Sequence, residues 1–302
     1  MIAKPLFGID LGGTKTEGIV LGRNDPGSVL CRHRLPTNAE KGYEHILLNI
    51  KNLLKFLEEE SGQKAGSLGI CTPGTADPVT GLHKNSNTTC LNGKRFQADL
   101  SDLLKMPVYM ANDANCFVLA EASLGTVKEK APEAKVVFGI IMGTGVGGGL
   151  VVNGQVINGR HGIGGEWGHN FLDESGGPCY CGKTGCVEKI ISGPALEAFY
   201  AQRSGKKLPL TEILQLTESE RYAKDTLDRL IHFFGKAVAV LINILDPDAI
   251  VIGGGVGNID LLYSEGRKEV EKYIFNPKLE TLFLKPALGD SAGVFGAAML
   301  NA

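Results

Sequence analysis

Twice along this 302-residue chain, an apolar segment typical of a β-strand runs into a glycine-rich turn and continues as a second strand. The first copy, "LFGIDLGGTKTEGIVLG", predicts strands at 6–10 and 16–22. The second copy starts near Val136, "VVFGIIMGTGVGGGLVVNGQVING", and adds a third short strand after the turn at "VNGQ". Glycine makes up 41 of the 302 residues, about twice its average share, and the excess is concentrated in tight turns of this kind. Two similar units in one chain predict two related α/β domains with a cleft between them.

The rest of the sequence alternates between helix and strand patterns. Apolar spacing predicts an amphipathic helix over 43–60, and "SLGICTPG" predicts a buried strand. In "PVYMANDANCFVLAEASLG" we expect a short strand, a turn at Asn112 and Asp113, and a helix from about Ala114 to Leu124. Further helices are expected in "ISGPALEAFYAQRSG", "KDTLDRLIHFFGKAVAVLINILD" and "SAGVFGAAMLNA", and a buried strand in "AIVIGGG".

The charge balance points to a small-molecule partner. The chain has 31 basic and 33 acidic residues, without a long run of either sign, which argues against a nucleic-acid or membrane partner. No apolar run approaches the roughly 20 residues of a membrane span, and no signal peptide is evident, so we expect a cytoplasmic protein. In a reducing compartment, clustered cysteines are more often metal ligands or catalytic thiols than disulfides.

The glycine turns admit two interpretations. Gly143, Gly145 and Gly148 match the pattern G-x-G-x-x-G of dinucleotide-binding proteins, but a strand follows where that motif needs a helix. The alternative is a pair of hairpin turns whose N–H groups hold phosphates from two sides of a cleft, with Thr14 and Thr144 adding hydroxyls. Each turn could also be a plain hairpin, although the three glycine turns "DLGGTKT", "GTGVGGG" and "VIGGGVG" together weaken that view.

Cys179, Cys181 and Cys186 follow the spacing C-x-C-x4-C, and His169 lies ten residues ahead. Three thiolates and an imidazole form the closed tetrahedral set of a structural zinc site, whereas a redox site would favour C-x-x-C. Buried thiols without a metal are the alternative. The other four cysteines have no such spacing and are expected to be ordinary: Cys31, Cys71, Cys90 and Cys116.

Two glutamates frame this segment. Glu166 precedes His169 by three residues and Glu188 follows Cys186 by two, so a metal would draw both carboxylates together. A ring nitrogen of His169 on the metal would leave the other free for a ligand hydroxyl. A pair of exposed glutamates without a role is the alternative.

Asp113 is the candidate general base. A carboxylate at a strand-to-helix junction can accept a proton from a hydroxyl. Helix capping by Asn112 or Asp113 explains the same residues equally well on sequence grounds alone, and Asn112 could do both.

Six motifs, in order, give the chain a resemblance to the ROK sugar kinases from Phe7 to the C-terminus: "GIDLGGTKTE", "ANDANC", "GTGVGGG", "GEWGH", "CYCGKTGCVE" and "VIGGG". The resemblance implies a two-domain α/β actin-like ATPase (ribonuclease H-like) fold that closes on ATP and a sugar. ROK repressors carry an additional N-terminal helix-turn-helix domain, and the early first strand favours a kinase here. We expect domains at 1–113 with 291–302, and at 114–290.

The resemblance also implies residue roles. Asp113 matches the catalytic base, ionised in the resting enzyme, and Asp10 lies where the fold places a carboxylate near Mg²⁺. The residues that match sugar contacts are Gly74, Asn87, Asn112, Asp113, Glu166, His169 and Glu188. Those that match the phosphate turns are Gly12, Gly13, Thr14, Lys15, Gly143, Thr144 and Gly145, with Gly254 and Gly255 on the adenosine side. The ligands of structural Zn²⁺ are His169, Cys179, Cys181 and Cys186.

The motifs look most like the fructokinase and mannofructokinase branch, so fructose or mannose is the expected hexose and its 6-hydroxyl the acceptor. Trp167 fits that branch, while Cys90 stands where a tryptophan is common. An N-acetylglucosamine kinase or a glucokinase is the alternative. A sugar-sensing binding protein would require loss of Asp113 or of the phosphate turns, which are intact. Members of the family are commonly dimers, so a homodimer is expected.

Overall fold

The computed structural model describes residues 4–22, 24, 25 and 27–302. These residues form two compact units. The first comprises the chain up to Pro132 with Gly149–Gly164 and Ala287–Ala302, and the second comprises Glu133–Gly148 and Gly165–Pro286. The first unit therefore extends past residue 113, where the sequence-based division ended its first domain.

The first unit contains a five-stranded mixed sheet. Its strands are β1 (Leu6–Leu11), β2 (Lys15–Leu21), β3 (Val29–Pro36), β4 (Leu68–Thr72) and β7 (Val108–Asn112), in the spatial order β3-β2-β1-β4-β7. β1 and β2 form the predicted antiparallel hairpin, and β4 lies parallel to both β1 and β7. The carboxyl ends of three parallel strands therefore meet at one edge of the sheet, where α/β proteins place ligands.

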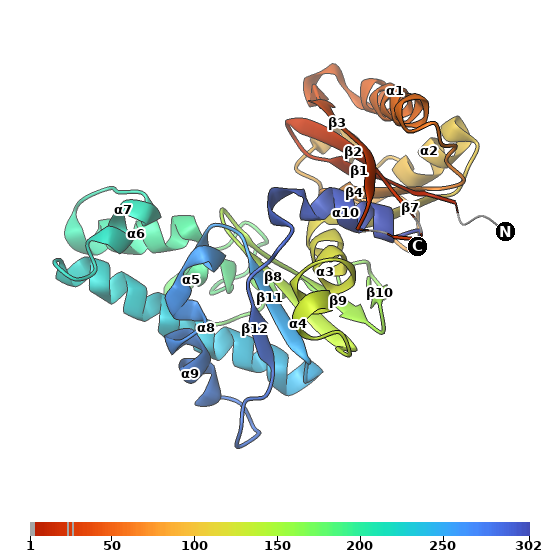
Figure 1. The fold of residues 1–302 in the computed structure, drawn as a ribbon. Coiled ribbons are helices and arrows are strands. Elements are labelled where there is room, and N and C mark those ends of the chain that lie inside the picture. Colours follow the sequence, from red (N-terminus) through yellow and green to blue (C-terminus); the bar gives the residue numbers. More distant parts are fainter. Residues whose placement is uncertain (1–3, 23, 26) are drawn as a thin grey trace. The chain divides into compact units, whose positions relative to one another are not determined.

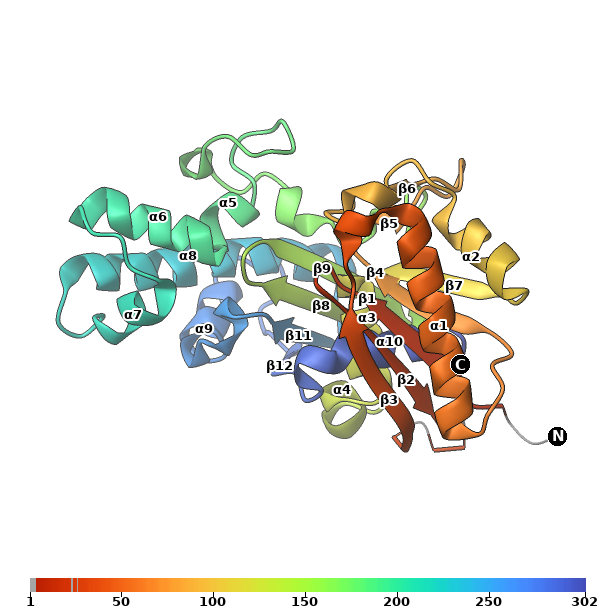
Figure 2. The ribbon, with the colours of Figure 1, turned by 90° about the horizontal axis from the view of Figure 1, so that it is seen from above.

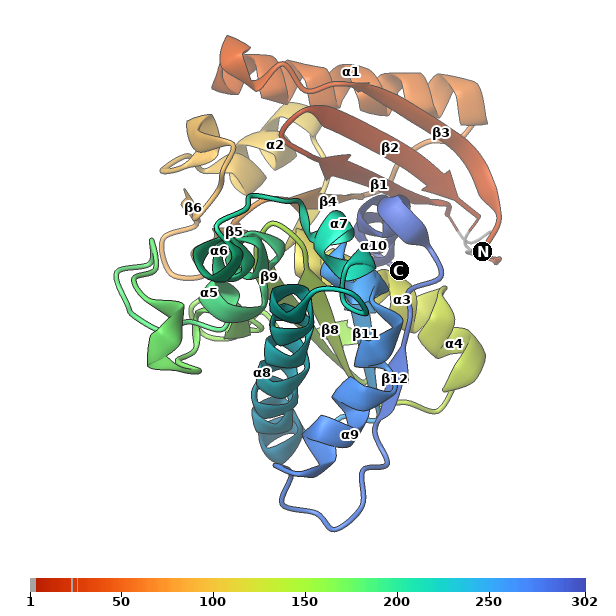
Figure 3. The ribbon, with the colours of Figure 1, turned by 90° about the vertical axis from the view of Figure 1, so that its left-hand side faces the viewer.

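Successive side chains of β1 point to opposite faces of the sheet, and different helices cover the two faces. Phe7, Ile9 and Leu11 pack with α1 (Tyr43–Ser61) and α2 (Phe96–Leu104). Leu6 packs with α10 (Ala292–Met299), and Figure 3 shows α1 and α10 on opposite faces of this sheet. Asp10 lies on the α10 face, so an acidic side chain alternates with the apolar residues of the α1 face.

Helix α10 approaches the sheet closely because glycines face it. A Cβ atom on Gly69 would lie 1.8 Å from the Ala297 carbonyl oxygen, and one on Gly8 would lie 2.4 Å from the Ala298 nitrogen. Backbone cannot yield as a flexible side chain can, so these two positions require glycine.

Gly69→Ala is expected to lower the free energy of unfolding by about 1–3 kcal/mol or more, because overpacking against backbone forces α10 away from the sheet. Urea unfolding followed by circular dichroism measures the change. Gly66→Ala is the matched control, because its Cβ would meet only the flexible Lys4 side chain, at 3.2 Å. Equal unfolding midpoints for the two variants would contradict this account.

The second sheet repeats the plan of the first. Its strands are β8 (Val136–Met142), β9 (Val146–Val152), β10 (Gln155–Val156), β11 (Ala249–Gly253) and β12 (Leu282–Leu284), in the order β10-β9-β8-β11-β12. In both sheets the order is third, second, first, fourth and fifth strand along the chain. β11 is parallel to β8 and β12, and the chain passes from the second unit into the first within β9.

The second unit also contains five α-helices among its described residues. They are α5 (Glu188–Ile191), α6 (Gly193–Ser204), α7 (Leu210–Gln215), α8 (Arg221–Leu245) and α9 (Glu265–Glu271). α6, α7 and the start of α8 pack together, as Figures 1 and 2 show. Within the described chain, no helix combines the length and apolarity that crossing a bilayer requires.

Helix α3 (Asp113–Ser123) packs against α10 in the first unit and is followed by α4 (Thr126–Lys130). The Glu121 carboxylate is fully buried and accepts hydrogen bonds from the N–H groups of Thr126, Ala287 and Leu288. It therefore holds the segment by which the chain returns to the first unit. These contacts explain why α3 belongs to this unit and not to the second, where the sequence-based division placed it.

Candidate active site

Asp113 lies at a junction without a loop. β7 ends at Asn112 and α3 starts at the next residue, so the predicted turn at Asn112 and Asp113 is absent. The Asn112 side-chain oxygen accepts a hydrogen bond from the Asn115 N–H (2.9 Å), which caps the helix. Asn112 is therefore the cap, and Asp113 projects from the first residue of the helix.

The Asp113 carboxylate is exposed yet partly screened from water by neighbouring protein atoms. This desolvation raises its pKa, because burial disfavours the charged form. Hydrogen bonds from backbone N–H groups, including that of Ala114 at 2.8 Å, oppose the increase. A raised pKa makes the carboxylate a better proton acceptor than an ordinary aspartate.

Asp10 is a second carboxylate of the same unit. Burial raises its pKa, and the nearby charges of Asp113 and Glu17 raise it further. Cys71, its register partner on β4, donates a hydrogen bond that partly offsets these effects. A Cβ atom on Gly293, in α10, would lie 2.7 Å from an Asp10 carboxylate oxygen and 3.4 Å from the Cys71 sulfur. Small residues and a buried thiol thus surround Asp10 on the α10 face.

The turn from Gly12 to Lys15 is fixed by the segment after β3. The Gly12 N–H donates to the Lys15 carbonyl oxygen (2.9 Å), which closes the turn. The buried Thr37 hydroxyl donates to the Gly12 carbonyl oxygen (2.7 Å), and the Thr37 N–H donates to the Thr14 carbonyl oxygen. A Cβ atom on Gly13 would meet nothing within 4 Å, so the tip of the turn faces open space.

The second unit gathers the other glycine turns. The Gly193 N–H, at the start of α6, donates to the Gly143 carbonyl oxygen (2.9 Å). Gly254 has a φ of 82°, and a Cβ there would lie 2.2 Å from the Met142 carbonyl oxygen. The predicted phosphate turn at Gly143, Thr144 and Gly145 therefore lies beside the Gly254–Gly255 turn and a helix N-terminus. A helix was expected here, with Ser192 before Gly193 and Pro194 as a recognisable start signal, but its N-terminus was not among the predicted site residues.

Glu188 connects this turn to the cysteine segment. One of its carboxylate oxygens accepts a hydrogen bond from the Val146 N–H (3.0 Å), just after the turn. Trp167 is buried, and its indole N–H donates to the Gly147 carbonyl oxygen (2.8 Å). A Cβ atom on Gly168 would lie 1.9 Å from the Val146 carbonyl oxygen, so "GEWGH" is docked on β9. This docking fixes the backbone on either side of Glu166 and His169.

The predicted metal ligands converge. One ligand atom from each of His169, Cys179, Cys181 and Cys186 lies within 4.8 Å of the other three. The Cys181 and Cys186 sulfurs are 3.6 Å apart, and the Cys179 sulfur is 3.6 Å from the His169 Nδ1 atom. Sulfur ligands about 2.3 Å from a tetrahedral zinc lie about 3.8 Å apart, so the separation of the Cys181 and Cys186 sulfurs is compatible with a shared metal ion.

Tyr180 occupies the other ring nitrogen of His169. Its hydroxyl lies 3.0 Å from the His169 Nε2 atom, and the two rings meet edge to face. The expectation from the sequence is a sugar hydroxyl at this nitrogen, and no sequence signal indicates a role for Tyr180. Tyr180 is 82% exposed, so a ligand can displace its hydroxyl without disturbing a core.

A cavity of about 270 Å³ in the second unit brings several of these groups together. Thr144 and Glu188 line it with Tyr180, the start of α6 and Arg229. A predicted phosphate turn and a predicted sugar contact thus share one cavity with the cysteine segment.

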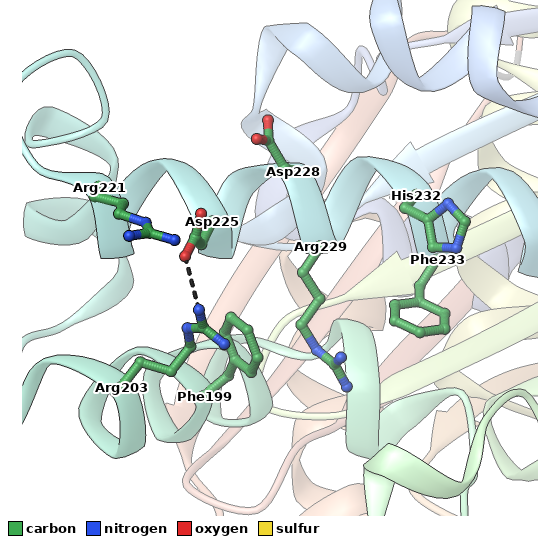
Figure 4. Close-up of a pocket in the computed structure, with 8 residues that line it drawn as sticks. All are labelled: Phe199, Arg203, Arg221, Asp225, Asp228, Arg229, His232 and Phe233. Atoms are coloured by element: carbon green, nitrogen blue, oxygen red, sulfur yellow. Dashed lines mark hydrogen bonds and ion pairs between the residues drawn. The ribbon is translucent and has the colours of Figure 1, made fainter.

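A larger cavity, of about 410 Å³, follows α6 and α8 and contains none of the predicted site residues (Figure 4). Arg203 pairs with Asp225 across it at 3.0 Å. The Arg229 guanidinium lies 4.7 Å from the ring centres of both Phe199 and Phe233 and donates to the Ser175 hydroxyl (2.8 Å). Arg203 and Arg229 are thus engaged with a carboxylate or with aromatic rings, which is typical of a structural surface.

The predicted site residues are divided between the two units. The first unit holds Asp10, Gly12, Gly13, Thr14, Lys15, Gly74, Asn87, Asn112 and Asp113. The second holds Gly143, Thr144, Gly145, Glu166, His169, Cys179, Cys181, Cys186, Glu188, Gly254 and Gly255.

Known proteins resemble the chain over almost its full length. Residues 6–302 match the ROK family. An N-acetyl-D-glucosamine kinase of Vibrio atlanticus is 35% identical over 306 residues, which cover 98% of this chain and 99% of that protein. A ROK hexokinase structure from Thermus thermophilus is 29% identical, with a TM-score of 0.85 and coverage of 98% and 97%. A ROK family glucokinase from Streptomyces griseus, solved with glucose and AMPPNP, is 26% identical, with a TM-score of 0.72 and 98% coverage of each chain. These structures confirm the predicted fold class, a two-domain α/β actin-like ATPase fold.

Proposed function

Because this chain belongs to the ROK family and is a sugar kinase, we propose that it transfers the γ-phosphoryl group of ATP to the 6-hydroxyl of a hexose, with Asp113 as general base. The observation that carries the role of Asp113 is its position as the first residue of α3, with its pKa raised by desolvation. A carboxylate held in this way can accept the hydroxyl proton as the phosphorus–oxygen bond forms. ADP is the leaving group, so the proton ends on Asp113 and the phosphoryl group on the sugar.

The glycine turns are proposed to bind the ATP phosphates. Backbone N–H groups in tight turns form anion-binding concavities, and Gly13, Thr144 and Gly255 have open space or solvent in front of them. The turns of the first unit include Lys15, whose ammonium adds a positive charge. The Gly254–Gly255 turn would hold the adenosine side.

Asp10 is proposed to hold the magnesium ion that accompanies ATP. Carboxylate oxygens suit this hard cation, and the carboxylate of Asp113 adds negative charge near Asp10. When bound, the ion would neutralise phosphate charge during transfer.

The cluster of His169, Cys179, Cys181 and Cys186 is proposed to hold a structural zinc ion. The set provides four protein ligands, which leaves no open coordination position for substrate. Its role would be to fix the segment that carries Glu166, His169 and Glu188, the proposed sugar contacts. Gly74, Asn87 and Asn112 are the proposed contacts from the first unit.

Two candidates for the sugar rest on different observations. The motifs favour fructose or mannose, whereas the similarity to N-acetyl-D-glucosamine kinases favours that amino sugar. We expect an ADP-release assay to show turnover with at least one of fructose, mannose, glucose and N-acetylglucosamine. The sugar with the highest kcat/KM identifies the substrate, and no turnover with any of the four would contradict the proposed function.

A sugar-sensing protein without catalysis is the alternative from another class, and the same assay separates it, since it would bind sugar without releasing ADP. The resemblance to the family also leads us to propose a cytoplasmic homodimer. Light scattering of the purified protein tests the dimer.

A further inference from the structure

His83 is a buried histidine behind a proposed sugar-binding turn. It lies in β6 (His83–Lys84), which pairs with β5 (Thr75–Ala76), and it is 2% exposed. Its Nε2 atom lies 2.9 Å from the Pro73 carbonyl oxygen, and its ring meets Phe96 edge to face. Its Nδ1 atom is buried and has no hydrogen-bond partner among the described residues.

These contacts determine the state of the ring. A carbonyl oxygen can only accept, so Nε2 must carry the hydrogen and Nδ1 the lone pair. Burial lowers the pKa of His83, which agrees with a neutral ring. An unpaired buried nitrogen opposes folding, and an apolar side chain would fill a core position without this cost. The retained imidazole is therefore best explained by the hydrogen bond that it donates to Pro73.

That hydrogen bond orients the Pro73–Gly74 peptide. The described chain has no cis peptide bonds, so the Pro73 carbonyl and the Gly74 N–H point in opposite directions across one planar unit. With the carbonyl held by the buried ring, the Gly74 N–H is directed away from His83. Gly74 itself has a φ of 78°, and a Cβ there would lie 2.3 Å from the Lys84 carbonyl oxygen.

The same histidine supports the second proposed sugar contact of this region. The backbone N–H of His83 donates to the Lys94 carbonyl oxygen, and the backbone carbonyl of His83 accepts from the Gly93 N–H, both at 2.8 Å. Asn92 precedes Gly93, and its side chain makes two hydrogen bonds with the backbone of Ser86. Ser86 directly precedes Asn87, so the position of Asn87 depends on the same packed segment.

We propose that His83 is a positioning residue for the sugar: its Nε2–H fixes the Pro73 carbonyl, and thereby aims the Gly74 N–H at an acceptor oxygen of the hexose. This inference rests on the proposed function, because it takes Gly74 as a sugar contact. His83 itself would not touch the sugar and would act through the orientation of the Pro73–Gly74 peptide.

Two substitutions that differ by one methylene test the proposal. The amide nitrogen of glutamine in His83→Gln can reach the Pro73 carbonyl as Nε2 does, whereas the amide in His83→Asn is too short. We expect His83→Asn to raise the KM for the sugar about 10-fold, the worth of one hydrogen bond, with the KM for ATP unchanged. His83→Gln should keep the sugar KM within about threefold of the original value. Equal sugar KM values for the two variants would overturn the proposal, because burial alone would then explain the residue.

A measurement on the unsubstituted protein covers the case in which a variant does not fold. The ¹⁵N chemical shifts of the His83 ring should show hydrogen on Nε2, and saturating sugar should shift the Gly74 amide resonance. Hydrogen on Nδ1, or an unchanged Gly74 resonance, would contradict the proposal. Failure of the kinase function is distinguishable, because the unsubstituted protein would then release no ADP with any sugar.

Discussion

Asp113→Asn is expected to lower kcat by about 10²- to 10⁴-fold, the usual contribution of a general base, while the affinity for the sugar changes little. Asparagine keeps the size and the hydrogen-bonding outline of aspartate but accepts no proton. A coupled ADP-release assay gives kcat, and calorimetry gives the sugar affinity. Asp102→Asn is the matched control, because Asp102 is another exposed aspartate of the first unit, on α2.

The pH dependence supplies a second readout of the same residue. A base works only when it is ionised. The value of kcat/KM should therefore be highest above the pKa of Asp113 and should decrease as the pH falls through that pKa. Because desolvation raises this pKa above the ordinary 3.8, we expect the acid limb to lie at higher pH than for a free aspartate. Near-normal kcat in Asp113→Asn would exclude the proposed role.

Cys181→Ser is expected to remove the metal from the cysteine cluster. Small peptides with structural zinc sites bind Zn²⁺ with a free energy of about 10–16 kcal/mol, and loss of one thiolate ligand removes a large part of this binding energy. Cys181 is exposed, so serine at this position leaves core packing intact. Metal analysis should give about one zinc per chain in the unsubstituted protein and a small fraction of that in the variant.

Loss of the metal in Cys181→Ser should weaken the binding of ATP as well as that of the sugar. Glu188 lies two residues after a ligand, and its carboxylate binds the Val146 N–H beside the phosphate turn. We therefore expect the KM values for both sugar and ATP to rise in Cys181→Ser. Cys31→Ser serves as the control, because Cys31 lies outside the cluster and is only half-buried. Full zinc content in Cys181→Ser, or none in the unsubstituted protein, would refute the proposed site.

The regular elements were predictable because they carry local signals. Both glycine hairpins, the long helix over 43–60 and the buried strand "AIVIGGG" follow from apolar periodicity and turn residues, and the structure confirms them. The candidate metal site could be anticipated from cysteine spacing, and its four potential ligand atoms lie within 4.8 Å of one another.

The remaining features depend on contacts between distant residues. The turn expected at Asn112 does not form, because a capping side chain lets β7 continue directly into α3. The extent of the first unit depends on Glu121 and its hydrogen bonds to Ala287 and Leu288, more than 160 residues away. Likewise, nothing in the sequence places Tyr180 on His169 or Cys71 beside Asp10, since these pairs arise from the packing of separate segments.

The direct passage from β7 into α3 has a thermodynamic consequence for turnover. A base on a flexible loop would lose conformational entropy each time a substrate arrived, and this loss would add to the activation barrier. Asp113 is the first residue of α3 and directly follows β7, and Asn112 caps the first turn of the helix. Its backbone is therefore ordered once, when the chain folds, and no part of that ordering cost recurs in the catalytic cycle.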